Sequence, residues 1–128
     1  MADREFDIIV YGATGYTGRL VAEHFLREYG STVDGPKWAM AGRSLSKLEA
    51  VRDEIGAPKT IPLVVADADD RTSLDAMCKR AKVILTTVGP YQLYGDGLVA
   101  ACVATGTDYA DLCGEPAWMR EQIDLHHA

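Results

Sequence analysis

The chain has 128 residues, of which 13 are basic and 19 acidic, so its net charge is −6 at neutral pH. This length predicts one domain with a core that needs no covalent staples. The negative charge, without a basic stripe, argues against a nucleic-acid-binding protein. The acidic amino terminus lacks a signal-peptide pattern, and no apolar run reaches the ~20 residues of a membrane span.

The cysteines predict a reduced, cytoplasmic protein. Cys78, Cys102 and Cys113 are widely spaced, odd in number and form no CxxC pair. That pattern favours free thiols and argues against a zinc site. His126 and His127 supply too few ligands for a metal, so we expect no metal centre.

Five segments of the sequence are typical of strands. Three of them are nearly continuous apolar runs, as expected for parallel strands that are covered on both faces. Glycine and proline separate them from their neighbours. The predicted strands are residues 6–11, 37–41, 61–66, 82–88 and 108–112.

Helical patterns fill the intervals between these strands. In the first helix, Leu20, Val21, Phe25 and Tyr29 recur on one stripe that we expect to face the core. The predicted helices are residues 17–29, 46–55, 71–81 and 97–105, with a fifth that begins at Pro116.

Two of these helices carry capping signals at their amino ends. Ser46 and Glu49 have the spacing of a capping box at the second helix. Asp69 or Asp70 is expected to cap the third helix.

The alternation of strands and helices predicts the fold class. Right-handed crossovers turn such a chain into an α/β protein with a doubly wound parallel sheet, for which we expect the strand order 3-2-1-4-5. The sequence ends inside a helical pattern, REQIDLHHA. We therefore expect a sheet truncated before its last strand and a parent protein longer than this chain.

A glycine loop follows the first strand and opens the first helix. Gly12, Gly15 and Gly18 stand in GATGYTG. In a Rossmann loop the first glycine allows a tight turn, the middle one lets a pyrophosphate approach, and the third packs the helix against the strand. The alternative is a glycine-rich turn without a ligand, but the strand and helix around it favour a phosphate site. A P-loop is excluded because no lysine follows Thr17.

The end of the second strand indicates which dinucleotide is bound. Arg43 stands where an NAD-binding domain has an acidic residue, and an arginine there suits a 2′-phosphate. Ser44 adds a hydroxyl donor, and Lys47 lies one turn further along. The alternative is a solvated arginine. The sequence thus predicts NADP(H) rather than NAD(H).

Two more strand ends carry candidate contacts. Asp67 follows the third strand, where the adenine of a dinucleotide would lie. Gly89 and Pro90 end the fourth strand and lead a loop over the middle of the cofactor. Tyr91 and Tyr94 lie on that loop, either at the rim of the site or in packing.

With these residues identified, the chain resembles a known family. The segments VYGATGYTG, AGRSLSKL, TTVGPYQLYG and LVAACVATGTDYADLCGE are similar to saccharopine dehydrogenase-like proteins, and within them to trans-acting enoyl reductases. The resemblance implies that residues 1–128 are the dinucleotide-binding Rossmann domain of a longer oxidoreductase. The substrate or dimerisation domain of the parent protein would lie outside these residues.

The resemblance also implies groups of site residues. The phosphate loop would comprise Gly12, Thr14, Gly15, Tyr16, Thr17 and Gly18. The 2′-phosphate would meet Arg43 and Ser44. The nicotinamide half would lie by Val88, Gly89, Pro90 and Tyr91. The entry to the active cleft would be lined by Tyr109, Asp111, Gly114 and Glu115.

Hydride transfer needs a proton donor besides the cofactor. No tyrosine has a lysine four residues later, which excludes the Tyr-x-x-x-Lys arrangement within this chain. Tyr91, Asp111 and Glu115 are candidates, each with a structural role as the favoured alternative. The expected substrate is a small or lipid-linked molecule.

Other functions stay open at this stage. The chain could be a non-catalytic NADP(H)-sensing module, or an assembly piece kept for dimerisation. We expect the isolated domain to be inactive and to form homo-oligomers. Any membrane contact would be made only by the rest of the parent protein.

Overall fold

The fold is a single five-stranded parallel sheet with helices on both faces. A computed structural model describes residues 5–29, 37–67, 69–87 and 96–111. Its strands are β1 (Phe6–Tyr11), β2 (Trp38–Gly42), β3 (Leu63–Val65), β4 (Ala81–Thr86) and β5 (Asp108–Asp111). Its helices are α1 (Tyr16–Tyr29), α2 (Leu45–Glu54), α3 (Arg71–Lys79) and α5 (Asp96–Thr105).

The strand order is β3-β2-β1-β4-β5, with every neighbouring pair parallel, which confirms the predicted doubly wound sheet. The order reverses between β1 and β4, because the chain builds outward from β1 to β3 and then returns to the other side of β1. Ligands of such sheets bind beyond the carboxyl ends of the strands at this reversal. The glycine loop after β1 therefore lies at the expected position.

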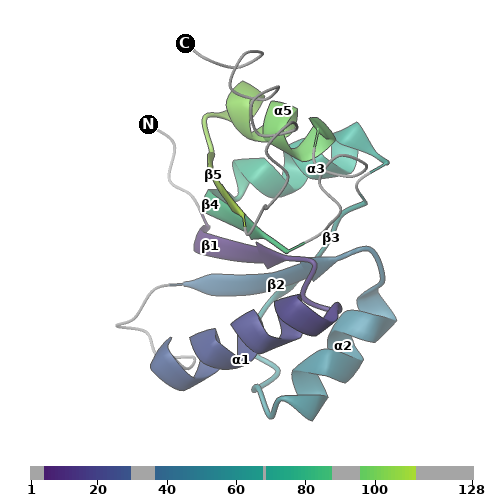
Figure 1. Ribbon diagram of the computed structural model, residues 1–128, viewed down its shortest axis with the longest axis vertical. Helices are drawn as coiled ribbons and strands as arrows, with labels where there is room; N and C mark the ends of the chain where they lie inside the picture. Colours follow the sequence, from purple (N-terminus) through teal and green to yellow (C-terminus); the bar gives the residue numbers. More distant parts are fainter. Residues whose placement is uncertain (1–4, 30–36, 68, 88–95, 112–128) are drawn as a thin grey trace.

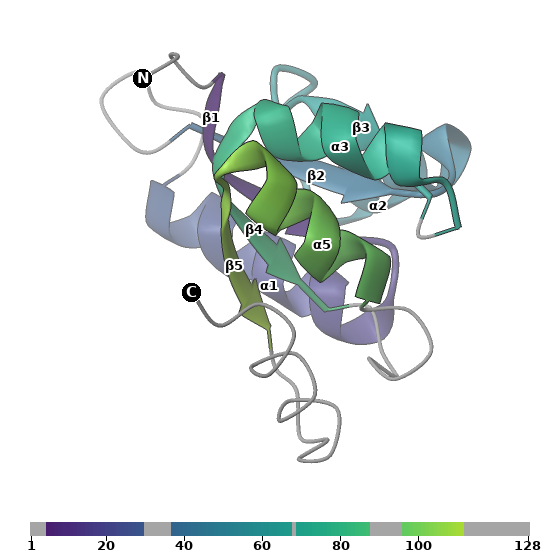
Figure 2. The same cartoon turned by 90° about the horizontal axis from the view of Figure 1, so that it is seen from above.

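Two layers of helices enclose the sheet. In Figures 1 and 2, α1 and α2 cover one face, and α3 and α5 cover the other. Ile9, Leu74 and Ile84 belong to the core on the α3–α5 side. Val10, Met40 and Leu48 belong to the core on the α1–α2 side. Alternate residues of each strand thus serve opposite cores, which explains the continuous apolar runs in the sequence.

The capping box predicted at Ser46 and Glu49 is wrong. Helix α2 begins at Leu45, and Ser44 is its N-cap, with an extended backbone and a side chain that accepts from the Lys47 amide. The prediction failed because Ser44 and Ser46 are both plausible caps in the sequence. The path of the backbone after Gly42 decides that Ser44 caps α2.

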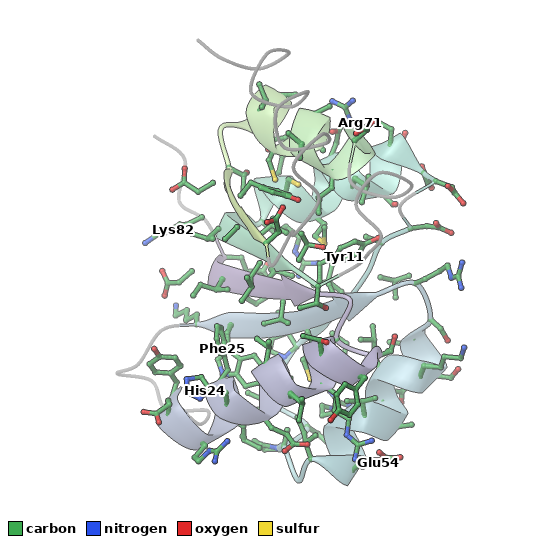
Figure 3. The ribbon with its side chains drawn as sticks, in the orientation of Figure 1. Tyr11, His24, Phe25, Glu54, Arg71 and Lys82 are labelled. Atoms are coloured by element: carbon green, nitrogen blue, oxygen red, sulfur yellow. The ribbon has the colours of Figure 1, made fainter. Side chains whose placement is uncertain are left out.

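The apolar stripe predicted on α1 is only partly buried. The helix approaches the sheet through Gly18 and Ala22, which are its buried residues. Phe25 packs against the core on the α1–α2 side of the sheet, edge-on to Trp38. Figure 3 shows it between α1 and the sheet. Leu20 and Tyr29 are instead 47% and 37% exposed. Because small residues bring the helix close, larger side chains beside them are displaced to its flanks.

Smaller differences concern element ends. Strand β3 is shorter than predicted because the chain turns at Pro58 to Ile61 before it, where the Ile61 amide donates to the Pro58 carbonyl. Helix α3 stops at Lys79, and Ala81 already pairs with Phe6 as the first residue of β4. The predicted helix at Pro116 lies outside the described residues. Among those that are described, no helix combines the length and apolarity needed to cross a bilayer.

Candidate functional site

The candidate site runs along the carboxyl edge of the sheet. Because all five strands are parallel, the residues that end them share this edge. The residues at or just beyond the ends of β3, β2, β1, β4 and β5 are, in spatial order, Asp67, Arg43, Gly12, Thr87 and Asp111. A cationic side chain and a glycine turn thus lie near the centre, with carboxylates at both ends.

Two positions of the β1–α1 loop require glycine, one because of its backbone conformation and the other because of close packing. Gly12 has a φ of +88°, a region that favours glycine. A Cβ atom on Gly18 would lie 1.9 Å from the Gly12 carbonyl oxygen and 2.8 Å from Thr87 Oγ1. The roles predicted for the first and third glycines are supported by this geometry: one makes the turn, and the other lets α1 lie against it.

Thr87 connects this loop to β4, a contact that no motif in the sequence indicates. Its hydroxyl lies 3.2 Å from the Gly12 carbonyl oxygen and 3.3 Å from that of Tyr11, so it donates to this carbonyl pair. The Thr87 amide also donates to Tyr11. On the other side, the amides of Gly12 and Ala13 donate to the Ala41 carbonyl of β2. Neighbouring strands therefore fix the loop from both sides.

Gly15 differs from the other two glycines because no described part of the chain requires a glycine there. A Cβ atom there would meet only the Gly12 carbonyl oxygen, at 3.5 Å, an ordinary contact. Gly15 precedes the first residue of α1, so it occupies the N-cap position without a side chain to cap the helix. Space beside Gly15 is thus available for a ligand.

The first amides of α1 are left without acceptors. Within the described residues, the amides of Thr14, Tyr16 and Thr17 have no hydrogen-bond partner, while the Gly15 amide closes the turn onto Gly12. Gly15, Tyr16 and Thr17 are exposed. Donors of this kind at a helix amino end, together with the helix dipole, form an anion site.

The β2–α2 turn places Arg43 next to this loop. Arg43 is exposed and, within the described part of the chain, makes no ion pair. Lys47 is exposed on the first turn of the same helix. A helix amino end does not favour cations, so these two side chains suit an added anion. Ser44 lies between them and caps α2.

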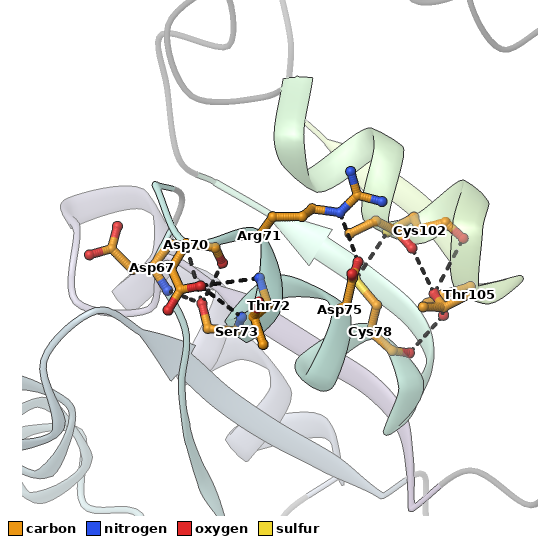
Figure 4. Close-up of polar contacts among 11 residues, drawn as sticks. Asp67, Asp70, Arg71, Thr72, Ser73, Asp75, Cys78, Cys102 and Thr105 are labelled. Atoms are coloured by element: carbon orange, nitrogen blue, oxygen red, sulfur yellow. Dashed lines mark hydrogen bonds and ion pairs between the residues drawn. The ribbon is translucent and has the colours of Figure 1, made fainter.

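The β3–α3 turn instead satisfies its own donors. Asp70 is the N-cap of α3, and its Oδ1 accepts from the amides of Thr72 at 3.1 Å and Ser73 at 3.3 Å, as Figure 4 shows. This confirms the cap predicted at Asp69 or Asp70. Asp67 Oδ1 accepts from the Asp69 amide at 2.9 Å, and the Asp67 amide donates to Ser73 Oγ. Asp67 therefore stays a candidate adenine contact with one carboxylate oxygen already engaged.

Tyr11 is a further aromatic residue at this edge. It is the last residue of β1 and its ring is buried on the α3–α5 side, where Figure 3 labels it. Burial is the main cause that raises the pKa of its phenol to about 12, with the nearby Asp67 carboxylate adding to the shift. The phenol is therefore neutral at physiological pH, and it serves as a packing residue under the loop.

Asp111 ends β5 with its carboxylate held by a neighbour. Tyr109 Oη donates to Asp111 Oδ2 at 2.6 Å, and the Tyr109 ring packs against the α3–α5 core. The remaining predicted site residues lie outside the described residues; they are Val88, Gly89, Pro90, Tyr91, Tyr94, Gly114 and Glu115. The structure thus brings together the loop, Arg43, Ser44, Asp67 and Asp111 along one edge.

Comparison with known sequences identifies relatives of this chain. The family model described as the saccharopine dehydrogenase NADP binding domain matches residues 8–128. A putative trans-acting enoyl reductase of Mycobacterium tuberculosis is 53% identical over 125 residues, which cover 97% of this chain and 29% of that protein. A trans-acting enoyl reductase of Mycobacterium bovis is 54% identical over 127 residues, again 29% of its length. The chain therefore spans under a third of these relatives.

Solved structures show the same fold at low sequence identity. An apo saccharopine dehydrogenase (L-Glu forming) from Saccharomyces cerevisiae superposes with a TM-score of 0.65 at 17% identity, covering 91% of this chain and 23% of that one. A triphenylmethane reductase of Citrobacter sp. complexed with NADP(H) gives a TM-score of 0.73 at 19% identity, covering 94% and 46%. These likenesses support the fold assignment alone.

Proposed function

Because the chain belongs to the family of saccharopine dehydrogenase NADP-binding domains, we propose that it holds NADP(H) along the carboxyl edge of its sheet for a reductase of the trans-acting enoyl reductase type. The pyrophosphate would lie on the open amides at the start of α1, and the 2′-phosphate beside Arg43 and Ser44. The observation that carries this placement is that, among the residues the structure describes, the first amides of α1 have no acceptor and the neighbouring Arg43 makes no ion pair.

The residues present fit this cofactor. Gly15 leaves space where a side chain would otherwise stand, and the exposed amides of Tyr16 and Thr17 are donors for phosphate oxygens. Arg43 offers a fork of donors that matches a phosphate. The bound nicotinamide supplies the hydride, while this chain binds and orients it.

The activity of the parent protein is part of the proposal. Relatives named trans-acting enoyl reductase are more than 50% identical to nearly the whole chain, which supports reduction of a carbon–carbon double bond in a lipid-linked or other small substrate. We further propose that the parent protein acts as a homo-oligomer. Proton handling by Tyr91, Asp111 or Glu115 stays a proposal for the parent protein as well.

A non-catalytic NADP(H) sensor is the alternative function. It would use the same loop and the same arginine, so binding alone does not separate the two. Reduction of an enoyl substrate by the full-length protein, lost when Gly15 is replaced by valine, would favour the reductase.

The proposed site is tested by calorimetric titration of NADPH and NADH into the chain and its Arg43→Ala variant. Loss of a charged hydrogen-bond partner costs about 1.5–3 kcal/mol, so NADPH affinity should fall by that amount while NADH affinity changes little. Arg27→Ala is the matched control, because Arg27 is also exposed but lies in the last turn of α1. Equal losses for both dinucleotides would contradict the role of Arg43.

A further inference from the structure

We propose that Tyr109 and Asp111 form a second binding element for the same dinucleotide, with the Asp111 carboxylate accepting hydrogen bonds from the ribose hydroxyls next to the nicotinamide. This inference rests on the proposed function, because it assumes that NADP(H) lies along the sheet edge. It assigns a role in cofactor binding to a residue pair on β5, the strand farthest from Arg43.

The strand order sets the direction of the cofactor. Arg43 follows β2 and the open amides follow β1, so a 2′-phosphate and a pyrophosphate placed there occupy two adjacent strand ends. The other half of the molecule must then continue away from β2, over the ends of β4 and β5. Since strands lie about 4.8 Å apart, β5 is roughly 10 Å from β1, a distance that one nucleotide half spans.

The pairing register puts Asp111 at this edge. Tyr11 pairs with Thr86 of β4, and Thr86 pairs with Asp111 of β5. These residues form the last rung of the sheet on that side, one residue below Thr87, whose hydroxyl holds the phosphate loop. Asp111 is therefore level with the loop that would bind the pyrophosphate, and it is partly exposed.

Tyr109 fixes the position of the carboxylate. Residues 109 and 111 point to the same face of β5 because strand side chains alternate. The Tyr109 ring is anchored against the core of buried side chains between the sheet and α3–α5. Its hydroxyl donates to Asp111 Oδ2 at 2.6 Å, a short, charge-assisted bond. Tyr109 is thus a positioning residue, and it orients a carboxylate that already stands at the edge.

The chemistry of the pair suits a ribose. An ionised carboxylate is an acceptor only, and a carboxylate near a strand end binds ribose hydroxyls in dinucleotide-binding folds. The position that usually provides it, after β2, is taken by Arg43 in this chain. A carboxylate after β5 would bind the ribose at the other end of the dinucleotide.

The test compares two ligands that differ in the nicotinamide half. NADPH has both riboses, whereas adenosine 2′,5′-bisphosphate has only the adenosine side. Asp111→Asn should weaken NADPH binding by about 10-fold or more, the loss expected for hydrogen bonds to a charged group. Binding of the bisphosphate should change less than about twofold. Tyr109→Phe should weaken NADPH binding a few-fold, again without affecting the bisphosphate.

Asp108→Asn is the matched control, because Asp108 lies on the same strand at its amino end and is exposed. It should leave both affinities unchanged. Unchanged NADPH affinity in Asp111→Asn, or equal losses of NADPH and bisphosphate affinity, would overturn the inference. If the wild-type chain still binds NADPH, the proposed function is unaffected by that result. A wild-type chain that binds neither ligand would remove the proposed function and this inference together. Circular dichroism checks that each variant is folded. If Asp111→Asn does not fold, the NADPH affinity of Tyr109→Phe tests the inference in its place.

Discussion

Two turns at the same edge of the sheet differ in how the first amides of the following helix find hydrogen-bond acceptors. Both β1–α1 and β3–α3 lead from a parallel strand into a helix, whose first amides lack partners inside the helix. At α3 the protein supplies them, since Asp70 accepts from Thr72 and Ser73. At α1 the N-cap is Gly15, which has no side chain to donate or accept. The protein thus completes α3 with Asp70, whereas the open amides of α1 are the donors for which we propose a bound pyrophosphate.

The largest effect is expected from a side chain at the close contact between α1 and its loop. In Gly18→Ala, the new Cβ would lie 1.9 Å from the Gly12 carbonyl oxygen. Since this neighbour is backbone held by Thr87, the strain should cost about 3 kcal/mol or more. Urea unfolding measures the loss. Gly15→Ala is the control and should cost no more than about 1 kcal/mol, the N-cap preference of glycine over alanine, because its Cβ meets an ordinary contact. Equal destabilisation of both variants would contradict the packing described.

The second effect converts the open turn into a capped one. In Gly15→Asp, a carboxylate at the N-cap accepts from the first amides of α1, as Asp70 does at α3. The free energy of unfolding should stay the same or rise by a few tenths of a kcal/mol. NADPH binding should be lost, since two like charges about 4 Å apart near a protein surface repel by about 4 kcal/mol. Urea unfolding measures the stability of the variant, and calorimetry measures its NADPH affinity. A stable Gly15→Asp variant that still binds NADPH would mean that the pyrophosphate lies elsewhere.

The smallest effect concerns the capped turn itself. Asp70→Ala removes the acceptor of two amides and should lower the free energy of unfolding by about 1 kcal/mol. NADPH affinity should change little, because this turn completes its helix without a ligand. Asp70→Asn is the control, since asparagine caps equally well. A large loss of NADPH affinity in Asp70→Ala, with stability unchanged, would contradict the comparison of the two turns.

Much of the fold could be predicted from the sequence. Strand β1 was predicted with its observed bounds, and the strand order follows from alternating strands and helices, because right-handed crossovers leave few arrangements. The errors arose where tertiary packing decides. Leu20 fits the apolar stripe of α1 by spacing, but Gly18 and Ala22 determine which face touches the sheet.

The site was predictable only where its chemistry is local. The glycine loop and Arg43 stand in short segments whose spacing has a physical meaning. Thr87 could not be found this way, because its hydroxyl bonds Gly12, which is 75 residues away in the sequence. The link between Tyr109 and Asp111 likewise depends on β5 lying beside β4.

Amide hydrogen exchange by NMR tests the central claim most directly, with and without saturating NADPH. In the free chain, the amides of Tyr16 and Thr17 should exchange rapidly, while those of Thr72 and Ser73 are already protected by Asp70. On NADPH binding, Tyr16 and Thr17 should become protected, and Thr72 and Ser73 should change little. Amides of Tyr16 and Thr17 that are protected before ligand is added, or that still exchange rapidly in the NADPH complex, would contradict the account.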